Sequence, residues 1–245
     1  MAIHTPALSS GPTVPYRMRS RRYRRLRSVL ERRQPDLTVL MEQVHKPHNL
    51  SAILRNCDAA GVLEAHAVPP RGGLEVHHDT SGGTKKWIHV HRHEDVDAAV
   101  ADLHAQGLTV LAAHPGEGAV DFRAVDFTRP TCLMMGAELH GVSDRGLELA
   151  DGTVVIPMEG MVRSLNVSVA TALLLYEAHR QRTAAGLYQE SRLEPDRFRR
   201  ILFEWCHPEL ARRCRDLGRS YPALGPEGEL LEDPLSGPDR PHGGE

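Results

Sequence analysis

The feature that most constrains the fold of this chain is the regular alternation of short apolar runs with segments of helical periodicity. The runs lie at 37–41, 65–68, 87–90, 109–112, 131–135 and 153–156. Between them apolar residues recur with the spacing of one helix face, as at Leu50, Ile53 and Leu54. Alternating strands and helices predict an α/β domain with a mostly parallel sheet flanked by helices, over residues 36–185.

The strongest helix prediction covers residues 164–182. Four apolar residues are expected to share its buried face: Leu165, Val169, Leu173 and Tyr176. Ser164 is expected to cap the helix, and Arg182 is expected to point outward. Asn166 would fall in the first turn, where asparagine has a poor helix propensity. We therefore expect Asn166 to have a binding role.

Outside this domain both ends of the chain are rich in arginine. Nine arginines lie within 17–33; a basic helix is expected over 16–35, and an Arg-rich helical extension over 186–221. Residues 1–15 and 222–245 are biased toward Pro, Gly and other polar residues, which predicts disorder. Because the arginine fork suits phosphate, we favour a polyanion-binding surface over a solvated helix face. The arginines expected to make such contacts include Arg21, Arg22, Arg24, Arg25, Arg199 and Arg200.

Several other classes of protein are disfavoured because their motifs are missing. The turn at 46–49 contains no glycine for a dinucleotide fold, and the chain has no Walker A lysine motif. The four cysteines form no Cys-x-x-Cys pair. His89-x-His91-x-His93 lacks a carboxylate or cysteine motif to complete a shell, so no metal is expected. No apolar run is long enough for a membrane helix, which predicts a cytoplasmic protein.

Segment 45–55 carries two residues that packing alone does not explain. Asn49 is placed to cap the helix that follows. Arg55 lies six residues further on, and helix N-termini attract phosphate, so the pair could hold the backbone around a reacting nucleotide. An ordinary surface arginine is the alternative.

Two further segments follow buried strands. Segment 135–143 is a turn bracketed by Gly136 and Gly141, in the position where open α/β sheets bind ligands. Segment 156–168 is a Met/Gly loop that leads into the long helix. A tight strand-to-helix connection is the alternative for the first of these.

The three segments, in this order and spacing, resemble the motifs of the TrmH family, SPOUT-class tRNA (guanosine-2′-O)-methyltransferases. The resemblance extends over about two thirds of the chain, and any one fragment alone would be weak evidence for it. The fragments are ERRQPDLTVL at 31–40, HKPHNLSAILR at 45–55, TSGGTKKW at 80–87, GAELHG at 136–141 and IPMEGMVRSLNVSVA at 156–170.

This resemblance implies a C-terminal trefoil knot in the sheet domain, a homodimer, and S-adenosylmethionine as the methyl donor. The residues it implies for cofactor binding are Ala112, Ala113, Gly136, Glu138, Gly141, Ile156, Met158 and Leu165. Arg55 matches the family's catalytic arginine, with Asn49 as its partner, and Ser164 and Asn166 match residues near the acceptor ribose. A guanidinium keeps its proton at any ordinary pH. Arg55 is therefore either transiently deprotonated with help from an RNA phosphate, or it orients the ribose and phosphate.

The terminal arms resemble those of the tRNA-specific branch, which implies methylation of guanosine 18 in the D-loop. Two alternatives stay open. The same reaction could act on ribosomal RNA or on another tRNA position. The chain could also be an RNA-binding protein without catalysis, although the presence of Arg55, Gly136 and Gly141 disfavours this.

Overall fold

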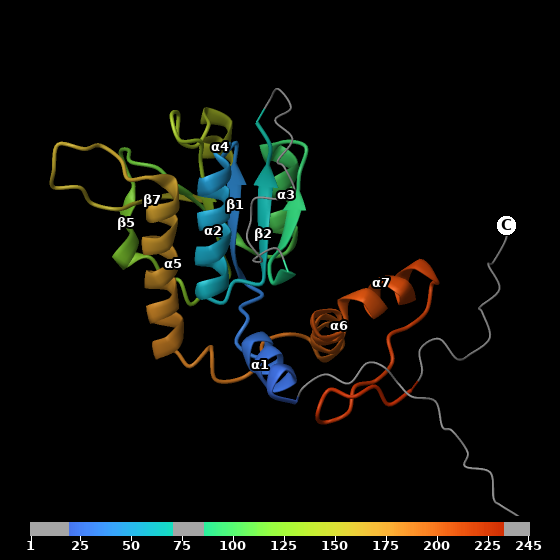
Figure 1. Ribbon diagram of the computed structural model, residues 1–245. Coiled ribbons are helices and arrows are strands. Elements are labelled where there is room, and N and C mark those ends of the chain that lie inside the picture. Colours follow the sequence, from blue (N-terminus) through green and yellow to red (C-terminus); the bar gives the residue numbers. More distant parts are fainter. Residues whose placement is uncertain (1–19, 71–85, 233–245) are drawn as a thin grey trace, which may run out of the picture. The chain divides into compact units, whose positions relative to one another are not determined.

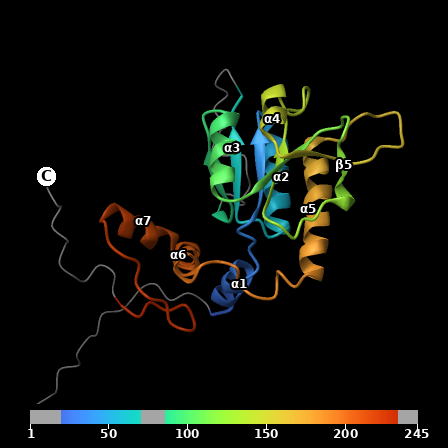
Figure 2. The same cartoon turned by 180° about the vertical axis from the view of Figure 1, so that it is seen from behind.

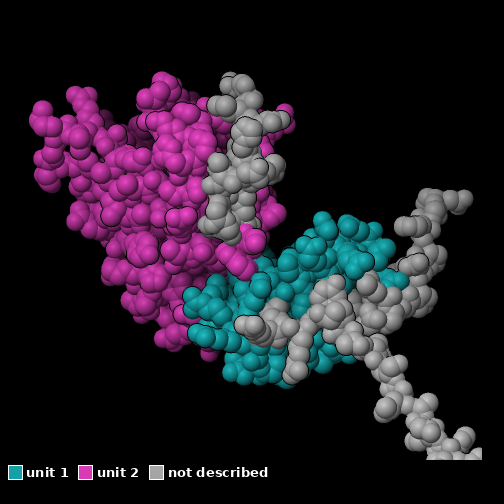
Figure 3. All heavy atoms as spheres, viewed as in Figure 1, with its two compact units in different colours: residues 1–30, 194–245 teal, residues 31–193 magenta. Residues whose placement is uncertain are grey.

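The computed structural model describes residues 20–70 and 86–232, which form two compact units. The first unit consists of residues 1–30 and 194–245, and the second of residues 31–193 (Figure 3). The fragment at 80–87 lies mostly outside the described residues, as do residues 1–15 and 233–245.

The second unit is built on a sheet of seven strands in the order β3-β2-β1-β6-β4-β7-β5 (Figure 1). All of the strand pairs are parallel. The strands are β1 (Leu37–Glu42), β2 (Glu64–Val68), β3 (His89–Arg92), β4 (Thr109–Ala113), β5 (Val120–Asp121), β6 (Thr131–Met135) and β7 (Gly152–Val155). The prediction of a parallel sheet flanked by helices is confirmed, and the trefoil knot stays a prediction.

Helices cover both faces of this sheet (Figures 1 and 2). On one face lie α2 (Pro47–Ala59) and α5 (Val167–Ala184), and on the other α3 (Val96–Ala105) and α4 (Asp144–Leu149). A short 3-10 helix, η2 (Phe122–Ala124), follows β5. In the central strand β6, Leu133 faces the α2/α5 core while Cys132 and Met134 face the α3 core. Burial on both faces explains why β6 is an uninterrupted apolar run.

The structure corrects the predicted face of the long helix. Buried positions of α5 include Thr171, Leu174, Leu175 and Ala178, whereas Val169, Leu173 and Tyr176 are exposed and Leu165 precedes the helix. Arg182, expected to face outward, is 0% exposed. Both the exposed set and the buried set have helical spacing, so periodicity alone could not predict which set faces the core.

The first unit is helical and contains α1 (Ser20–Leu30), α6 (Pro195–Cys206) and α7 (Pro208–Asp216). α1 packs against α6 and buries Tyr23, Leu26 and Leu30. Leu224 and Leu230 form a bridge and pack on the α6/α7 core, although the predicted tail began at residue 222. The segment is rich in Pro, Gly and acidic residues, so its composition did not indicate that two of its leucines pack in a core. None of the described helices is both long and apolar enough to cross a membrane.

Candidate active site

A hydrogen-bonded chain of three side chains joins the three segments that the sequence analysis singled out. The amide of Asn49 donates through Nδ2 to Oε1 of Glu138 at 2.8 Å, and its Oδ1 accepts from Nδ2 of Asn166 at 3.1 Å. Asn49 is 1% exposed. These residues come from α2, from the loop after β6, and from the start of α5. Because strands β1, β6, β4 and β7 are parallel neighbours, their carboxyl ends bring these loops to one edge of the sheet.

Glu138 does the capping that was predicted for Asn49. α2 begins at Pro47, whose missing N–H costs nothing in the first turn, so the N-cap is Lys46 and Asn49 lies inside the helix. The carboxylate of Glu138 accepts from the backbone N–H of Lys46 at 3.2 Å. A negative charge is favoured at this end of the helix. The prediction that Asn49 caps α2 was therefore wrong.

The same carboxylate also contacts a histidine that sequence analysis did not single out. Nδ1 of His45 lies 2.8 Å from Oε2 of Glu138. Burial tends to raise the pKa of Glu138, but hydrogen bonds from Asn49 and from backbone groups outweigh it and hold that pKa below its usual range. Glu138 is thus a stable anion at neutral pH. The sequence sign of this pair is that His45 stands two residues before the start of α2, as the first residue of the motif at 45–55.

Asn166 has both a capping role and a positioning role. It is the N-cap of α5, with its Oδ1 accepting from the backbone N–H of Ser168 at 2.8 Å. The helix therefore begins three residues later than Ser164, which was wrongly predicted as the cap and which lies exposed in the preceding loop. Nδ2 of Asn166 donates to Asn49, and the contact of Asn166 with a ligand stays a prediction.

Arg55 does not belong to this chain of hydrogen bonds. It lies on α2 six residues beyond Asn49, which is about 9 Å along the helix axis. Its side chain is exposed, and among the residues that the structure describes no ion pair or hydrogen bond engages it. Its neighbour Asn56 donates to the backbone oxygen of Ser168 at 2.8 Å, which fixes α2 against α5. Arg55 is therefore held on a rigid helix with its guanidinium available to a ligand.

The glycine turn is shaped by two different requirements. A Cβ on Gly136 would lie 2.0 Å from the backbone of Gly141, so no other residue fits there without movement of the turn. Gly141 has a φ of +69°, in the left-handed region that favours glycine. Ser143 caps α4 as its pattern suggests, accepting from the N–H of Gly146 at 3.0 Å. The buried carboxylate of Glu42, at the end of β1, accepts in turn from the N–H of Ser143 at 2.9 Å.

The other predicted cofactor-binding residues lie at the end of β4 and in the loop after β7. Ala112 and Ala113 end β4, which pairs with both β6 and β7, and Ile156, Met158 and Leu165 lie in the loop after β7. A Cβ on Gly141 would lie 3.8 Å from Nδ1 of His114, so the loops after β4 and β6 approach each other closely. Large apolar side chains are exposed in two of the loops: Leu139 in the loop after β6, and Met161 and Val162 in the loop after β7.

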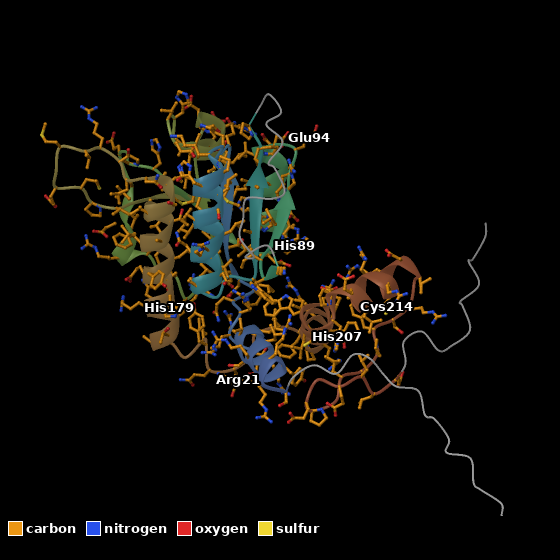
Figure 4. All side chains as sticks on the ribbon, viewed as in Figure 1. Arg21, His89, Glu94, His179, His207 and Cys214 are labelled. Carbon is orange, nitrogen blue, oxygen red and sulfur yellow. The ribbon has the colours of Figure 1, made fainter. Side chains whose placement is uncertain are left out.

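The arginines predicted to bind a polyanion are all exposed in the helical unit, in which Figure 4 labels Arg21. They are not equivalent. Arg24 pairs with Glu227 at 2.9 Å, and Arg199 pairs with Asp196 on the same helix. Two of the six predicted arginines therefore have an acidic partner within the unit.

Comparison with known protein families shows that this fold and site belong to a class of RNA methyltransferases. Residues 36–176 match the model of the SpoU rRNA Methylase family, and residues 180–233 match that of the SpoU rRNA methylase C-terminal region. The chain belongs to the SpoU methylase family.

Two named relatives are tRNA (guanosine(18)-2′-O)-methyltransferases. The protein from Thermus thermophilus is 57% identical over 184 residues, which are 75% of this chain and 95% of that protein. The protein from Escherichia coli K12 is 49% identical over 218 residues, which are 88% of this chain and 95% of that protein. The similarity therefore extends well beyond the short fragments from which the family was inferred.

A solved structure shows the same architecture. The Aquifex aeolicus TrmH/SpoU tRNA modifying enzyme matches with a TM-score of 0.71 and 40% identity, over 78% of this chain and 97% of that one. The SpoU methyltransferase AviRb from Streptomyces viridochromogenes, solved in complex with the cofactor AdoMet, matches with a TM-score of 0.52 and 31% identity, over 63% of this chain and 62% of that one.

Proposed function

We propose that this chain is an S-adenosylmethionine-dependent tRNA (guanosine(18)-2′-O)-methyltransferase. The observation that carries the proposal is the Glu138–Asn49–Asn166 chain of hydrogen bonds, which joins the three motif segments at the ligand-binding edge of the sheet. The named relatives support the substrate, because the matched regions span nearly their whole length.

The loops after β4, β6 and β7 fit S-adenosylmethionine. They present two glycines, backbone groups and exposed apolar side chains, among them Met161 at 99% exposure. Such a surface suits a flat heterocycle better than it suits a phosphate. The residues we assign to cofactor contact are Ala112, Ala113, Gly136, Gly141, Ile156, Met158 and Leu165. Glu138 is reassigned to the start of α2, where its carboxylate is engaged.

When bound, S-adenosylmethionine supplies a methyl group on a sulfonium centre. In the transfer, the ribose 2′-oxygen forms a bond to the methyl carbon as the carbon–sulfur bond breaks, and the hydroxyl proton leaves to a base. The chain must hold the two reactants in line, because orientation supplies much of the rate. We assign this role to Ser164 and Asn166 at the edge of the sheet, with Arg55 contacting the ribose and its phosphate. Asn49, which is 1% exposed, acts as a positioning residue through its hydrogen bond with Asn166.

Two groups of this chain are candidates for the proton acceptor, Arg55 and His45. An arginine guanidinium is a poor base in water, so Arg55 would need an adjacent RNA phosphate to act as one. The imidazole of His45 lies at the same edge, with its Nδ1 facing Glu138. A carboxylate partner favours a fixed ring orientation. His45 is therefore a second group that could take the proton.

A homodimer is part of the same proposal. α5 exposes an apolar stripe made of Val169, Leu173 and Tyr176, which are 47%, 41% and 53% exposed. These residues lie three or four positions apart, so they line one face of the helix beside the loop of the site. Burial of this stripe against a second copy would place the partner next to the loop that ends at Asn166.

The decisive experiment is incubation of the full chain with an unmodified tRNA transcript and labelled S-adenosylmethionine, followed by nucleoside analysis. We expect one 2′-O-methylguanosine per transcript and none when position 18 is changed to adenosine. If a ribosomal RNA fragment is methylated and the tRNA is not, the substrate is ribosomal RNA and the proposed reaction is unchanged. Binding of tRNA without any methyl transfer would leave a non-catalytic RNA-binding protein.

A further inference from the structure

A layer of histidine and acidic side chains lies on the other face of the sheet, where α3 covers β2 and β3. Alternate residues of a strand point to the same face, so His89, His91 and His93 share one side of β3 and its extension. The register pairs His66 of β2 with His91. Figure 4 labels His89 and Glu94, which bracket this stretch of chain.

Three of these groups converge on a single point. Nδ1 of His66 lies 2.9 Å from Nε2 of His93, and that Nε2 lies 4.0 Å from Oδ2 of Asp102 on α3. All three ligand atoms lie within 4.8 Å of one another. Ligands bound to Zn²⁺ at about 2.0 Å are about 3.3 Å apart in a tetrahedron, so only small side-chain movements separate this arrangement from a coordination shell.

A hydrogen bond between the two imidazoles explains only part of this arrangement. It accounts for His66 and His93, but it gives no role to the carboxylate that faces them. At 4.0 Å neither histidine hydrogen-bonds this carboxylate; within the described ranges 20–70 and 86–232, its side-chain hydrogen bond comes from Gln106 on the same helix, at 3.2 Å to Oδ2. The side chain of Asp102 is 47% exposed. The carboxylate therefore has room to rotate toward the histidines.

The donor atoms of the cluster suit a metal ion. A neutral imidazole binds a metal through a ring nitrogen, and Nδ1 of His66 and Nε2 of His93 are the ring nitrogens that face each other here. Two neutral imidazoles and one carboxylate form a donor set that suits Zn²⁺ and related first-row ions.

We propose that His66, His93 and Asp102 bind one divalent first-row transition-metal ion, with Zn²⁺ the best match to this donor set. The ion would join β2, the end of β3 and α3, and its fourth position would take water. The site is independent of methyl transfer, because its residues lie on the opposite face of the sheet from α2 and α5. The sequence alone predicted no metal, since no carboxylate or cysteine motif accompanies these histidines; the carboxylate comes from α3, nine residues after His93.

The test uses the full chain without a histidine tag, after treatment with a chelator. Titration with Zn²⁺ followed by calorimetry is expected to show one ion bound per chain, and the melting temperature is expected to rise as Zn²⁺ is added. Replacement by Co²⁺ is expected to give the visible absorption of a tetrahedral site.

Two conservative variants test the proposed ligands and leave His66, which is the most buried of the three, unchanged. Asp102→Asn and His93→Gln are each expected to weaken Zn²⁺ binding at least tenfold, while the melting temperature in chelator stays near that of the parent. His104→Gln is the matched control, since His104 is on the same helix, is exposed and pairs with Asp151. Its Zn²⁺ affinity is expected to be unchanged. The proposal is overturned if the parent binds no ion stoichiometrically, or if both ligand variants bind as tightly as the parent.

Discussion

The two ends of the sheet each hold a buried polar network, and the networks differ in what they leave available. At the amino end, Arg182 donates to the backbone oxygens of Phe127 and Arg129 and pairs with Asp36 at 2.7 Å. At the carboxyl end, neutral amides and one carboxylate are joined beside loops whose apolar side chains are exposed. The first network is saturated and holds the fold together. The second positions side chains around a surface that a ligand can still reach.

The sharpest test of this contrast is Arg182→Met. Its loss would leave the buried carbonyl of Phe127 without its donor and remove one of the two arginines that pair with Asp36. A buried group left without its partner costs about 1–3 kcal/mol of the free energy of unfolding. Urea unfolding followed by circular dichroism measures this loss. Arg180→Ala, two residues away on the same helix and exposed, is the control and should barely move the transition. Equal effects of the two variants would contradict a structural role for Arg182.

Arg55→Ala, on the exposed face of α2, should instead slow the reaction and leave the stability of the fold unchanged. Removal of an exposed side chain that no described residue engages should leave the urea transition unchanged. Methyl transfer should slow by about 100-fold or more, because the ribose and its phosphate lose their orienting contact. Single-turnover rates with tRNA and the affinity for S-adenosylmethionine are the measurements. We expect the affinity to be unchanged. A variant that turns over like the parent would remove Arg55 from the site.

The amino-end network also predicts a pH dependence. Burial tends to raise the pKa of Asp36, but its hydrogen bonds and ion pairs with Arg192 and Arg182 prevail and hold that pKa below its usual range. A depressed native pKa contributes stability that is present above about pH 4 and is lost as the pH falls below it. The slope from one such group reaches at most about 1.4 kcal/mol per pH unit. Urea midpoints at pH 5, 4 and 3 should therefore fall less steeply in Asp36→Asn than in the parent.

The burial of the central strands can be predicted from the sequence, whereas the buried face of the helix α5 cannot. β6 and β1 are apolar on both faces, so their burial can be inferred from composition alone. The face of α5 could not be inferred, because the burial of Arg182 depends on Asp36, 146 residues away in the chain. Only the folded sheet brings the two residues together.

In the candidate active site too, residues could be predicted from their local segments, but contacts between residues far apart in the chain could not. Arg55 and the two glycines could be selected from their segments, because position after a strand or on a helix is a local property. The capping of α2 by Glu138 could not, because it joins residues 92 positions apart. Asp102 was missed for the same reason, since its approach to His66 and His93 depends on the packing of α3 on the sheet.

Asn166 offers a finer test, because its two contacts can be separated. Asn166→Asp keeps the oxygen that caps α5 but cannot donate to Oδ1 of Asn49, while Asn166→Ala loses both contacts. The alanine variant should lose about 1 kcal/mol of the free energy of unfolding, as for other N-caps. The aspartate variant should keep most of that stability and still show slower methyl transfer. If both variants lose only stability, Asn166 is a cap and has no part in the reaction.

The smallest effects are expected in the helical unit, where each arginine adds only a part of the attraction to tRNA. Release of counterions makes log affinity fall with log salt by about 0.7–0.9 per phosphate contact. The double variant Arg21→Gln with Arg25→Gln should therefore weaken tRNA binding and flatten this slope by one to two contacts. Arg24→Gln should change the slope less, because Arg24 is already paired with Glu227 at 2.9 Å. Filter binding at several salt concentrations measures both. A slope that is unchanged in the double variant would make α1 a solvated helix, and would leave recognition of tRNA to the edge of the sheet.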